Sequence, residues 1–365
     1  MTRRTVLLVS LIVIVGIFMF LDGARTAVAP KLVKFEGETM GTVWHVTIVS
    51  DGENPITTDA RYAEIQAGIE EVLKGVDFRM STWKEFTELS RINAQESVTE
   101  DIPLSPEMAF VLACALEISA KTGGAYDVTV GPLVNLWKFG PTRNNADMPE
   151  IPDDADIASA REFIGWDALE LLGDGKKTTL RRKKEGLQID LSSIAKGYGV
   201  DCVFDVLRKF GFTNFMVEVG GEVRSLGVNH MAKPWRIGIE LPKPGAEKIF
   251  GAVELTDCAL ATSGDYRNFK VDDGKRRSHI IDPRTGKPVE HALVSVSVLA
   301  SDCMTADGWA TALMVLGPEE GRKIATAEGL KVLFLVQDGE TIKPVSVGFK
   351  YEENPYLKEE KENTH

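Results

Sequence analysis

The twelve residues from Asp190 to Asp201, D-L-S-S-I-A-K-G-Y-G-V-D, join a short polar turn to a helix start and carry Lys196. A helix N-terminus presents unpaired N–H groups and the positive end of the helix dipole, and glycine lets the backbone approach a ligand closely. The stretch therefore predicts a pocket for an anionic ligand such as a phosphate. An exposed helix start with a solvated lysine explains the same residues, because no G-x-x-x-x-G-K-[ST] or G-x-G-x-x-G pattern accompanies them.

A second cluster, C-M-T-A-D-G-W-A-T, covers residues 303–311 and places Asp307 four residues before Thr311. That spacing puts both side chains on one face of a helix. A carboxylate and a hydroxyl so placed suit a hard divalent cation such as Mg²⁺, which prefers oxygen ligands and keeps positions open for substrate phosphate. The alternative is that Asp307 caps the helix and Thr311 packs in the core.

A third cluster begins at His279, where H-I-I-D-P-R-T-G is typical of a strand that ends in a tight turn. The unperturbed pKa of histidine, about 6.5, suits a general base, although a lone histidine is often structural. Asp282 fits a turn residue whose side chain bonds to the backbone. Two aromatic residues, Trp83 and Tyr126, either stack on a flat heteroaromatic ligand or belong to the core.

The segments that must position these clusters alternate between helical and strand-like patterns. Ser105 and Pro106 form a good N-cap and first turn for a helix that ends at Gly123-Gly124. The Pro-, Asp- and Asn-rich segment 141–158 predicts a long surface loop. Further helices are expected at 61–75, from the Asp190 cluster through Val200 to an end at Gly211, and at 303–316. Strands are expected at 41–49, 214–219, 236–241, 251–255, 293–300 and, as the last core strand, 331–336. The pattern predicts an α+β fold with mixed sheets and packed helices.

The composition and net charge of the chain argue against one class of function. The chain has 365 residues, is 44% hydrophobic and 26% charged, and has a net charge of −12. This argues for a globular protein and against a nucleic-acid binder, whose surface would be basic. The four cysteines lie far apart without metal-ligand spacing, so we expect buried free thiols, although one disulfide stays open in an exported protein: Cys114, Cys202, Cys258 and Cys303.

The N-terminus has the features of an export segment. Arg3 and Arg4 precede an apolar run over 6–21, and the small residues 27–29 follow it. Sixteen apolar residues are long for a signal-peptide core and short for a membrane-spanning helix, so cleavage after Ala29 and retention as an anchor are both open. Either way, the positive-inside rule places the rest of the chain outside the cytoplasm.

Taken together and in this order, the clusters resemble the ApbE family, the bacterial FAD:protein FMN transferases. The resemblance runs from about Phe35 to Val347 and implies an ApbE-like, T-fold-related architecture. Two departures are visible: Ser192 and Ser193 stand where the family commonly has Gly and Ala, and Tyr126 where Phe is commoner. The stretches that carry the resemblance are M-S-T-W (80–83), Y-D-V-T-V-G-P-L (126–133), D-L-S-S-I-A-K-G-Y (190–198), V-E-V-G-G-E (217–222), T-S-G-D-Y (262–266), H-I-I-D-P-R-T-G (279–286) and A-D-G-W-A-T (306–311).

The resemblance also implies roles for individual residues. His279 matches the proposed catalytic base, and Asp307 is expected to be both catalytic and a metal ligand. The other Mg²⁺ ligands would be Thr311 and the backbone carbonyl of Ser193. The flavin contacts of the family fall on Met40, Trp83, Ala125, Tyr126, Asp127, Asp190, Lys196 and Ile281.

The implied reaction is Mg²⁺-dependent transfer of the FMN half of FAD, the substrate, to a threonine or serine of a target protein, with release of AMP. Implied targets are flavoprotein subunits of membrane redox complexes of the NqrB/NqrC or RnfD/RnfG type, at the periplasmic side of the inner membrane. Residues 1–30 would be the signal peptide or membrane anchor, 31–350 the flavin transferase domain, and 351–365 a charged, disordered tail. Two alternatives stay open: an FAD pyrophosphatase that uses water as acceptor, and a non-catalytic periplasmic FAD-binding protein.

Overall fold

The structure is a computed structural model that describes residues 30–52, 54–95, 98–141, 151–173, 177–243, 248–264, 269–272 and 275–355. Three expectations fall outside these ranges: the export segment before residue 30, the middle of the predicted loop 141–158, and the charged tail after residue 355. The last two residues of T-S-G-D-Y also lie outside them. Within the described ranges, no helix combines the length and the apolar character that a membrane crossing needs.

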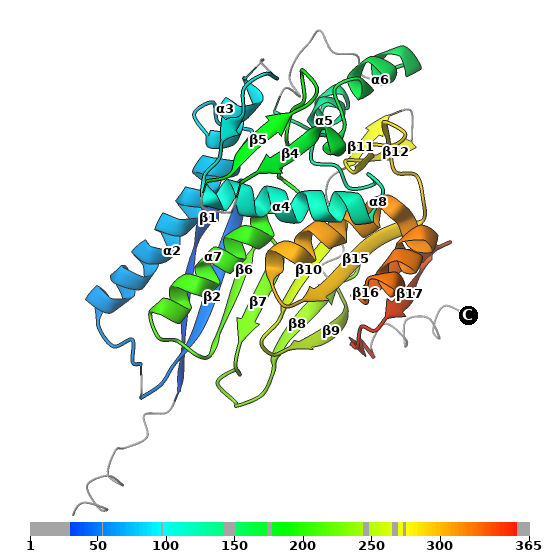
Figure 1. Ribbon diagram of the computed structural model, residues 1–365. Helices are drawn as coiled ribbons and strands as arrows, with labels where there is room; N and C mark the ends of the chain where they lie inside the picture. Colours follow the sequence, from blue (N-terminus) through cyan, green and yellow to red (C-terminus); the bar gives the residue numbers. More distant parts are fainter. Residues whose placement is uncertain are drawn as a thin grey trace, which may run out of the picture.

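The centre of the fold is an eight-stranded sheet in which every strand pairing is antiparallel (Figure 1). The expected α+β class is confirmed, and antiparallel pairing refines the expectation of mixed sheets. A final strand that the sequence pattern did not predict, β17, follows 331–336 and forms one edge. The order across the sheet is β1 (Lys31–Thr39), β2 (Thr42–Ser50), β6 (Phe215–Val219), β7 (Glu222–Leu226), β10 (Ala259–Gly264), β15 (Leu293–Ala300), β16 (Lys331–Asp338) and β17 (Thr341–Val347).

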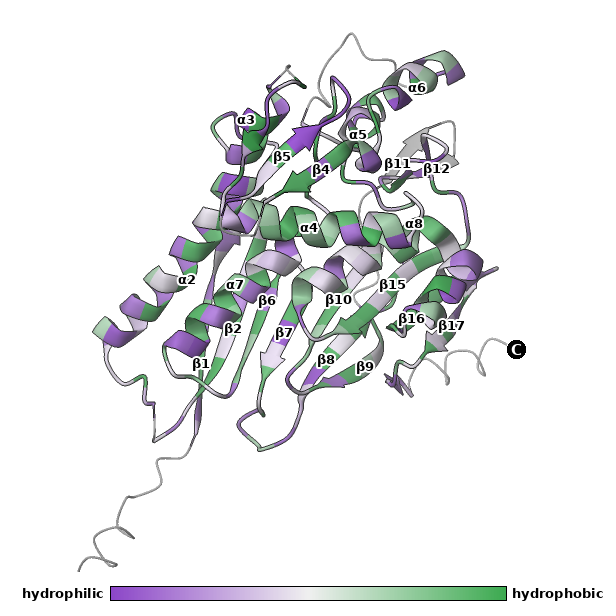
Figure 2. Ribbon diagram, in the orientation of Figure 1, coloured by the Kyte–Doolittle hydropathy of each residue, from purple (hydrophilic) through white to green (hydrophobic). Residues whose placement is uncertain are grey.

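Helices cover one face of the large sheet. A second, smaller sheet also packs against the large sheet. Hydrophobic residues predominate in the central strands, whereas hydrophilic and hydrophobic residues alternate along helix α2 (Asp59–Met80; Figure 2). A separate core cluster joins Trp235 and Ile239 of the small sheet to Leu260 and Leu333 of the large one. The covering helices are α2 (Asp59–Met80), α4 (Pro106–Lys121), α7 (Ala195–Lys209) and α8 (Cys303–Ala327), and the small sheet has the order β18 (Glu352–Glu353), β9 (Ile249–Leu255), β8 (Trp235–Glu240).

Local signals explain where the helices begin. Ser105 accepts a hydrogen bond from the backbone N–H of Met108, as expected of an N-cap. Helix α8 begins after Asp302, whose side chain accepts from the N–H of Thr305. The alternative that Asp307 caps its own helix is therefore wrong. Helix α8 is longer than the predicted 303–316 and bends at Gly317, whose φ of 75° interrupts the helical backbone.

Short elements gather beyond one end of the large sheet (Figure 1). The end of the predicted loop 141–158 is instead helical from Asp154, because Asp153 and Asp156 form a capping box. This group contains α3 (Glu88–Asn93), β3 (Ile102–Pro103), α5 (Gly131–Leu136), α6 (Asp154–Arg161), the 3₁₀ turn η1 (Trp166–Ala168), β4 (Leu169–Leu172), β5 (Thr179–Arg182), β11 (Phe269–Asp272), β12 (Lys275–Ser278), β13 (Ile281–Asp282) and β14 (Lys287–Pro288).

Candidate active site

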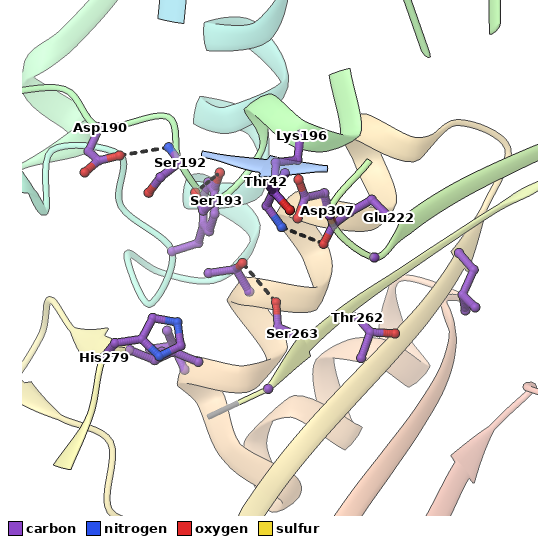
Figure 3. A pocket seen from close by; sticks show the side chains of 18 of the residues that line it. Thr42, Asp190, Ser192, Ser193, Lys196, Glu222, Thr262, Ser263, His279 and Asp307 are labelled. Carbon is purple, nitrogen blue, oxygen red and sulfur yellow. Dashed lines mark hydrogen bonds and ion pairs between the residues drawn. The ribbon is translucent and has the colours of Figure 1, made fainter. Parts of the chain in front are cut away.

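A cavity of about 700 Å³ lies where the starts of α7 and α8 meet the ends of the central strands. Figure 3 shows polar side chains from several segments that are distant in sequence, among them Lys196, His279 and Asp307, around this cavity. Ten of the twelve residues predicted from the sequence line it: Ala125, Tyr126, Asp127, Asp190, Ser193, Lys196, His279, Ile281, Asp307 and Thr311. The sequence clusters, up to 186 residues apart, therefore converge on one space, although the role of each residue stays a prediction.

Helix α7 starts at this cavity because the preceding turn is held by its own side chains. Asp190 Oδ1 accepts a hydrogen bond of 2.8 Å from Ser192 N–H, and Asp190 N–H donates to Val128 O at 2.7 Å. No side chain of the turn caps α7. Instead Asp307 Oδ2, from α8, accepts from Gly197 N–H at 2.9 Å. Asp307 therefore caps the neighbouring helix α7 rather than its own helix α8.

Two buried carboxylates and a half-buried lysine meet beside this contact. Lys196 Nζ lies 2.7 Å from Glu222 Oε1, and Asp307 is near enough to affect both groups. Burial raises the pKa of Glu222 and of Asp307 above the usual carboxyl range, although the attraction of Lys196 counteracts it. Burial opposes the charge of Lys196, but the two carboxylates outweigh burial and raise its pKa, so the ammonium group stays charged.

This cluster contains two acids and one base, so its ionised form has an excess negative charge. Glu222 Oε2 is also buried without a hydrogen-bond partner among the described residues. Both features fit a site that takes a further cation. Within the described part of the chain, no three His, Cys, Asp or Glu side chains are grouped to hold a metal. A metal ion here would need hydroxyl, carbonyl and substrate oxygens besides Asp307.

Oxygen donors of this kind are present. Thr311 lies one turn after Asp307 on α8, and its Oγ1 is 3.1 Å from Ser263 Oγ at the end of β10. Ser193 Oγ donates to Tyr126 Oη at 2.9 Å, which fixes the turn whose backbone carbonyl is the third candidate ligand. The donor set of carboxylate, hydroxyl and carbonyl is the set that Mg²⁺ prefers.

The aromatic and acidic residues before α5 form another part of the wall. Tyr126 is 3% exposed, and burial raises the pKa of its hydroxyl, so it stays neutral. Asp127 Oδ1 accepts from Thr129 N–H at 2.7 Å, and Oδ2 accepts from Trp166 N–H at 3.1 Å. Burial nevertheless raises the pKa of Asp127. The carboxylate of Asp127 therefore holds this part of the wall together through its hydrogen bonds, and the residue also lines the cavity.

His279 approaches from the opposite side, on the short segment between β12 and β13 (Figure 3). Its ring meets the edge of Phe139, with ring centroids 6.3 Å apart. Asp282 Oδ1 accepts from Arg284 N–H at 2.9 Å, which confirms the predicted turn. The imidazole is thus held near the cavity by a turn rather than by a regular element.

Two predicted flavin contacts do not line the cavity. Met40 packs into the core with a φ of 47° and precedes Gly41 and Thr42, which do line it. Trp83 is 54% exposed in the turn after α2. Their assignment to the flavin site stays a prediction.

Sequence reasoning missed Glu222 as a site residue. It stands directly after the Gly220-Gly221 turn, but nothing in its own neighbours signals that it is 2% exposed and paired with Lys196. The cysteine expectation is confirmed in that all four thiols are free, although only Cys303 is fully buried.

A known protein family, several related proteins and several solved structures match this chain over most of its length. The model of the ApbE family matches residues 40–334. The FAD:protein FMN transferase of Haemophilus influenzae is 41% identical over 325 residues, which cover 89% of this chain and 92% of that protein. The FAD:protein FMN transferase of Vibrio cholerae is 42% identical over 311 residues, covering 85% and 89%. The solved structure of the flavin transferase ApbE from Vibrio cholerae has a TM-score of 0.78 at 41% identity, covering 88% of this chain and 98% of that one.

Proposed function

The chain belongs to the ApbE family, and we propose from that premise how its cavity transfers the FMN half of FAD to an acceptor protein. Relatives that are 36–42% identical over most of their length are FAD:protein FMN transferases, so this chain is a transferase of that kind. The observation that carries the proposal is the convergence of Lys196, Asp307 and Thr311 on one wall with His279 on the other.

In the proposed reaction the hydroxyl oxygen of an acceptor threonine or serine forms a bond to the FMN-side phosphorus of FAD. The bond from that phosphorus to the bridging oxygen breaks, and AMP leaves with the bridging oxygen. Such reactions depend mainly on positioning and electrostatic stabilisation. Lys196 is placed to offset negative charge on the diphosphate, and His279 to accept the proton of the acceptor hydroxyl.

Asp307, Thr311 and the carbonyl of Ser193 would hold Mg²⁺. The ion supplies positive charge that stabilises the diphosphate oxygens as AMP departs. Burial raises the pKa of Glu222 and Asp307 beside Lys196, so a cation at this place would stabilise their ionised forms. Tyr126 offers an aromatic surface that is already ordered, with its hydroxyl bonded to Ser193.

We further propose that the acceptors are exported flavoprotein subunits of membrane redox complexes, of the NqrB/NqrC or RnfD/RnfG type, and that the enzyme acts on the periplasmic side of the inner membrane. The support is the basic and apolar N-terminus before residue 30, together with the family resemblance. The flavin is then a substrate, and the enzyme has no redox step of its own.

Mass spectrometry of an acceptor tests this function. The purified protein is incubated with FAD, Mg²⁺ and a soluble NqrC-type acceptor domain that carries the threonine. The expected result is an added mass of one FMN on the acceptor and an equal amount of AMP. An unmodified acceptor with FAD split into FMN and AMP would instead show the pyrophosphatase, and an unmodified acceptor with intact bound FAD would show a carrier.

A further inference from the structure

We propose that the acceptor segment binds as an added strand along the edge of β8 that faces away from β9, which leads its hydroxyl into the cavity. This inference rests on the proposed function, because only a transferase needs a second, protein substrate. It names a binding surface outside the residues that the family resemblance assigns to FAD and metal.

The first observation is how β8 meets the cavity. Four consecutive residues of this strand, 237–240, line it. Successive side chains of a strand point to opposite faces, so a strand that offers one face contributes only every second residue. The burial pattern agrees, since Ile237 and Ile239 turn toward the core while Gly238 and Glu240 are exposed. The strand therefore presents its edge, with its backbone, to the cavity.

The second observation is that this edge is the end of a sheet. β8 pairs with β9 on one side, from Trp235 opposite Leu255 to Glu240 opposite Ile249. On its other side the described part of the chain supplies no strand. An edge strand has a row of backbone N–H and C=O groups directed outward, which is the template for β-strand addition by a peptide.

The third observation is Gly238 in the middle of the strand. Glycine inside a strand weakens it and often marks a place where another backbone approaches closely. Here a side chain would also press on the flexible end of Ile249, because a Cβ atom would lie 2.9 Å from its Cδ1. The cavity lining also includes Val223 and Leu260, which belong to the buried core between the two sheets.

The occupant follows from continuity with the catalytic wall. The same cavity contains the β8 edge and His279, which receives the proton of the acceptor hydroxyl. FAD has no row of amide groups to match a strand edge, whereas any extended peptide has one. Recognition through the backbone would also let a single enzyme modify acceptors whose sequences differ around the threonine.

Hydrogen–deuterium exchange on the full chain tests the inference. The enzyme is compared alone, with FAD and Mg²⁺, and with FAD, Mg²⁺ and the NqrC-type acceptor domain whose threonine is replaced by alanine. The expected result is that exchange at 237–240 slows by about tenfold only when the acceptor is added, the scale on which one hydrogen bond acts. β17 is the internal control, because it is an edge strand away from the cavity and should not change.

Acceptor peptides with single N-methyl groups give a second test that leaves the enzyme unchanged. Strand addition predicts that N-methylation at alternate residues slows FMN transfer about tenfold, while the positions between them tolerate it. Equal effects at neighbouring positions, or protection of 237–240 by FAD alone with no further change on adding the acceptor, would overturn the inference. The unmodified acceptor is assayed in parallel, so absence of FMN transfer to it would identify a failure of the proposed function itself.

Discussion

The wall of the cavity formed by α7 and α8 is fixed by reciprocal helix caps, whereas the wall that carries His279 consists of short strands and turns. Asp307 of α8 accepts from Gly197 N–H of α7. In return Asp201 of α7 accepts from the N–H groups of Cys303 and Met304, at 2.9 Å and 2.8 Å, where α8 begins. Each helix therefore satisfies the unpaired donors of the other.

The opposite wall has no such arrangement among the described residues. β13 has two residues, and the turn after it is held by side-chain contacts of Asp282 with Arg284, which also pairs with Glu320 at 3.1 Å. Those two ion pairs are partly exposed and contribute little to stability. His279 is itself half-buried, and its neighbours Ile280 and Ile281 are held in the core rather than by helix caps.

The difference separates two tasks. Groups that hold a diphosphate and a metal ion must keep their geometry, because small displacements reduce catalysis strongly. A wall that admits a protein segment must instead open and close around it. We therefore expect substitutions in the α7–α8 wall to affect FAD binding and folding, and substitutions in the His279 wall to affect transfer alone.

The largest expected effect follows from Asp307→Ala. FMN transfer should fall by at least about 10³-fold, because the variant loses the metal ligand and the cap of α7 together. Asp307→Asn separates the two, since the amide oxygen still accepts from Gly197 N–H but has no charge. We expect Asn to restore stability in urea unfolding but not activity. Full transfer by Asp307→Ala, or by the wild type with Mg²⁺ chelated, would contradict the assignment.

Next comes His279→Ala, which should slow FMN transfer by about 10²-fold through loss of the general base. Because His279 is only half-buried and is not part of a helix cap, the free energy of unfolding should stay within about 0.5 kcal/mol of the wild type. The measurement pairs single-turnover transfer, followed by mass spectrometry, with urea unfolding. A large loss of stability with unchanged transfer would show that His279 serves folding rather than catalysis, which is the opposite of the role expected for its wall.

Lys196→Met tests the buried charges of the fixed wall. It leaves Glu222 buried without its cation, and breaking a buried pair costs about 3–5 kcal/mol. The double variant with Glu222→Gln is the control and should recover part of the loss, since neither partner then remains as an unpaired charge. Urea unfolding without FAD measures both, and equal stability of the single and double variants would contradict this prediction.

The same variant should acquire a pH dependence. Without Lys196, burial together with the repulsion of neighbouring carboxylates holds the pKa of Glu222 and of Asp307 above the value in the unfolded chain. The folded state then binds protons that the unfolded state releases, so the free energy of unfolding falls as the pH rises from about 4 toward neutrality. In the wild type the ammonium group should make this decline smaller. Unfolding curves at several pH values would show it.

The smallest expected effect concerns two glycines of α7. A Cβ at Gly197 would lie 2.4 Å from Cys303 O and 2.8 Å from Asp307 Cβ, so Gly197→Ala should push the helices apart and cost about 1–3 kcal/mol. At Gly199 the nearest atom is the flexible end of Met40, at 3.0 Å. Gly199→Ala should therefore change stability by less than about 1 kcal/mol. Similar stability of the two variants would show that the helices are not fixed at Gly197.

The sequence predicted the four long helices and several core strands because their signals are local. Strand 293–300 agrees with the structure at both ends, and Ser105 caps the helix that it was expected to cap. Helix α6 was missed because its capping box lies in a segment whose proline and acidic residues indicate a loop. Local composition does not show whether Asp153 and Asp156 will bond to each other's backbone.

The sequence indicated many of the residues that line the cavity, but it did not indicate how these residues contact one another. The motifs identified ten residues that line the cavity, whereas Glu222 and the caps from Asp201 and Asp307 depend on contacts between segments that are distant in sequence. The positions of the aspartates in the sequence do not show which helix each side chain caps. The edge position of β8 likewise depends on sheet order, which strand patterns do not specify.

FAD binding with and without Mg²⁺, measured by calorimetric titration for the wild type, Asp307→Ala and His279→Ala, tests the division between the two walls most directly. The account predicts that Mg²⁺ strengthens FAD binding in the wild type and in His279→Ala but not in Asp307→Ala. If Asp307→Ala kept the Mg²⁺ dependence, or His279→Ala lost it, the α7–α8 wall would not be the part of the cavity that holds the diphosphate and the metal.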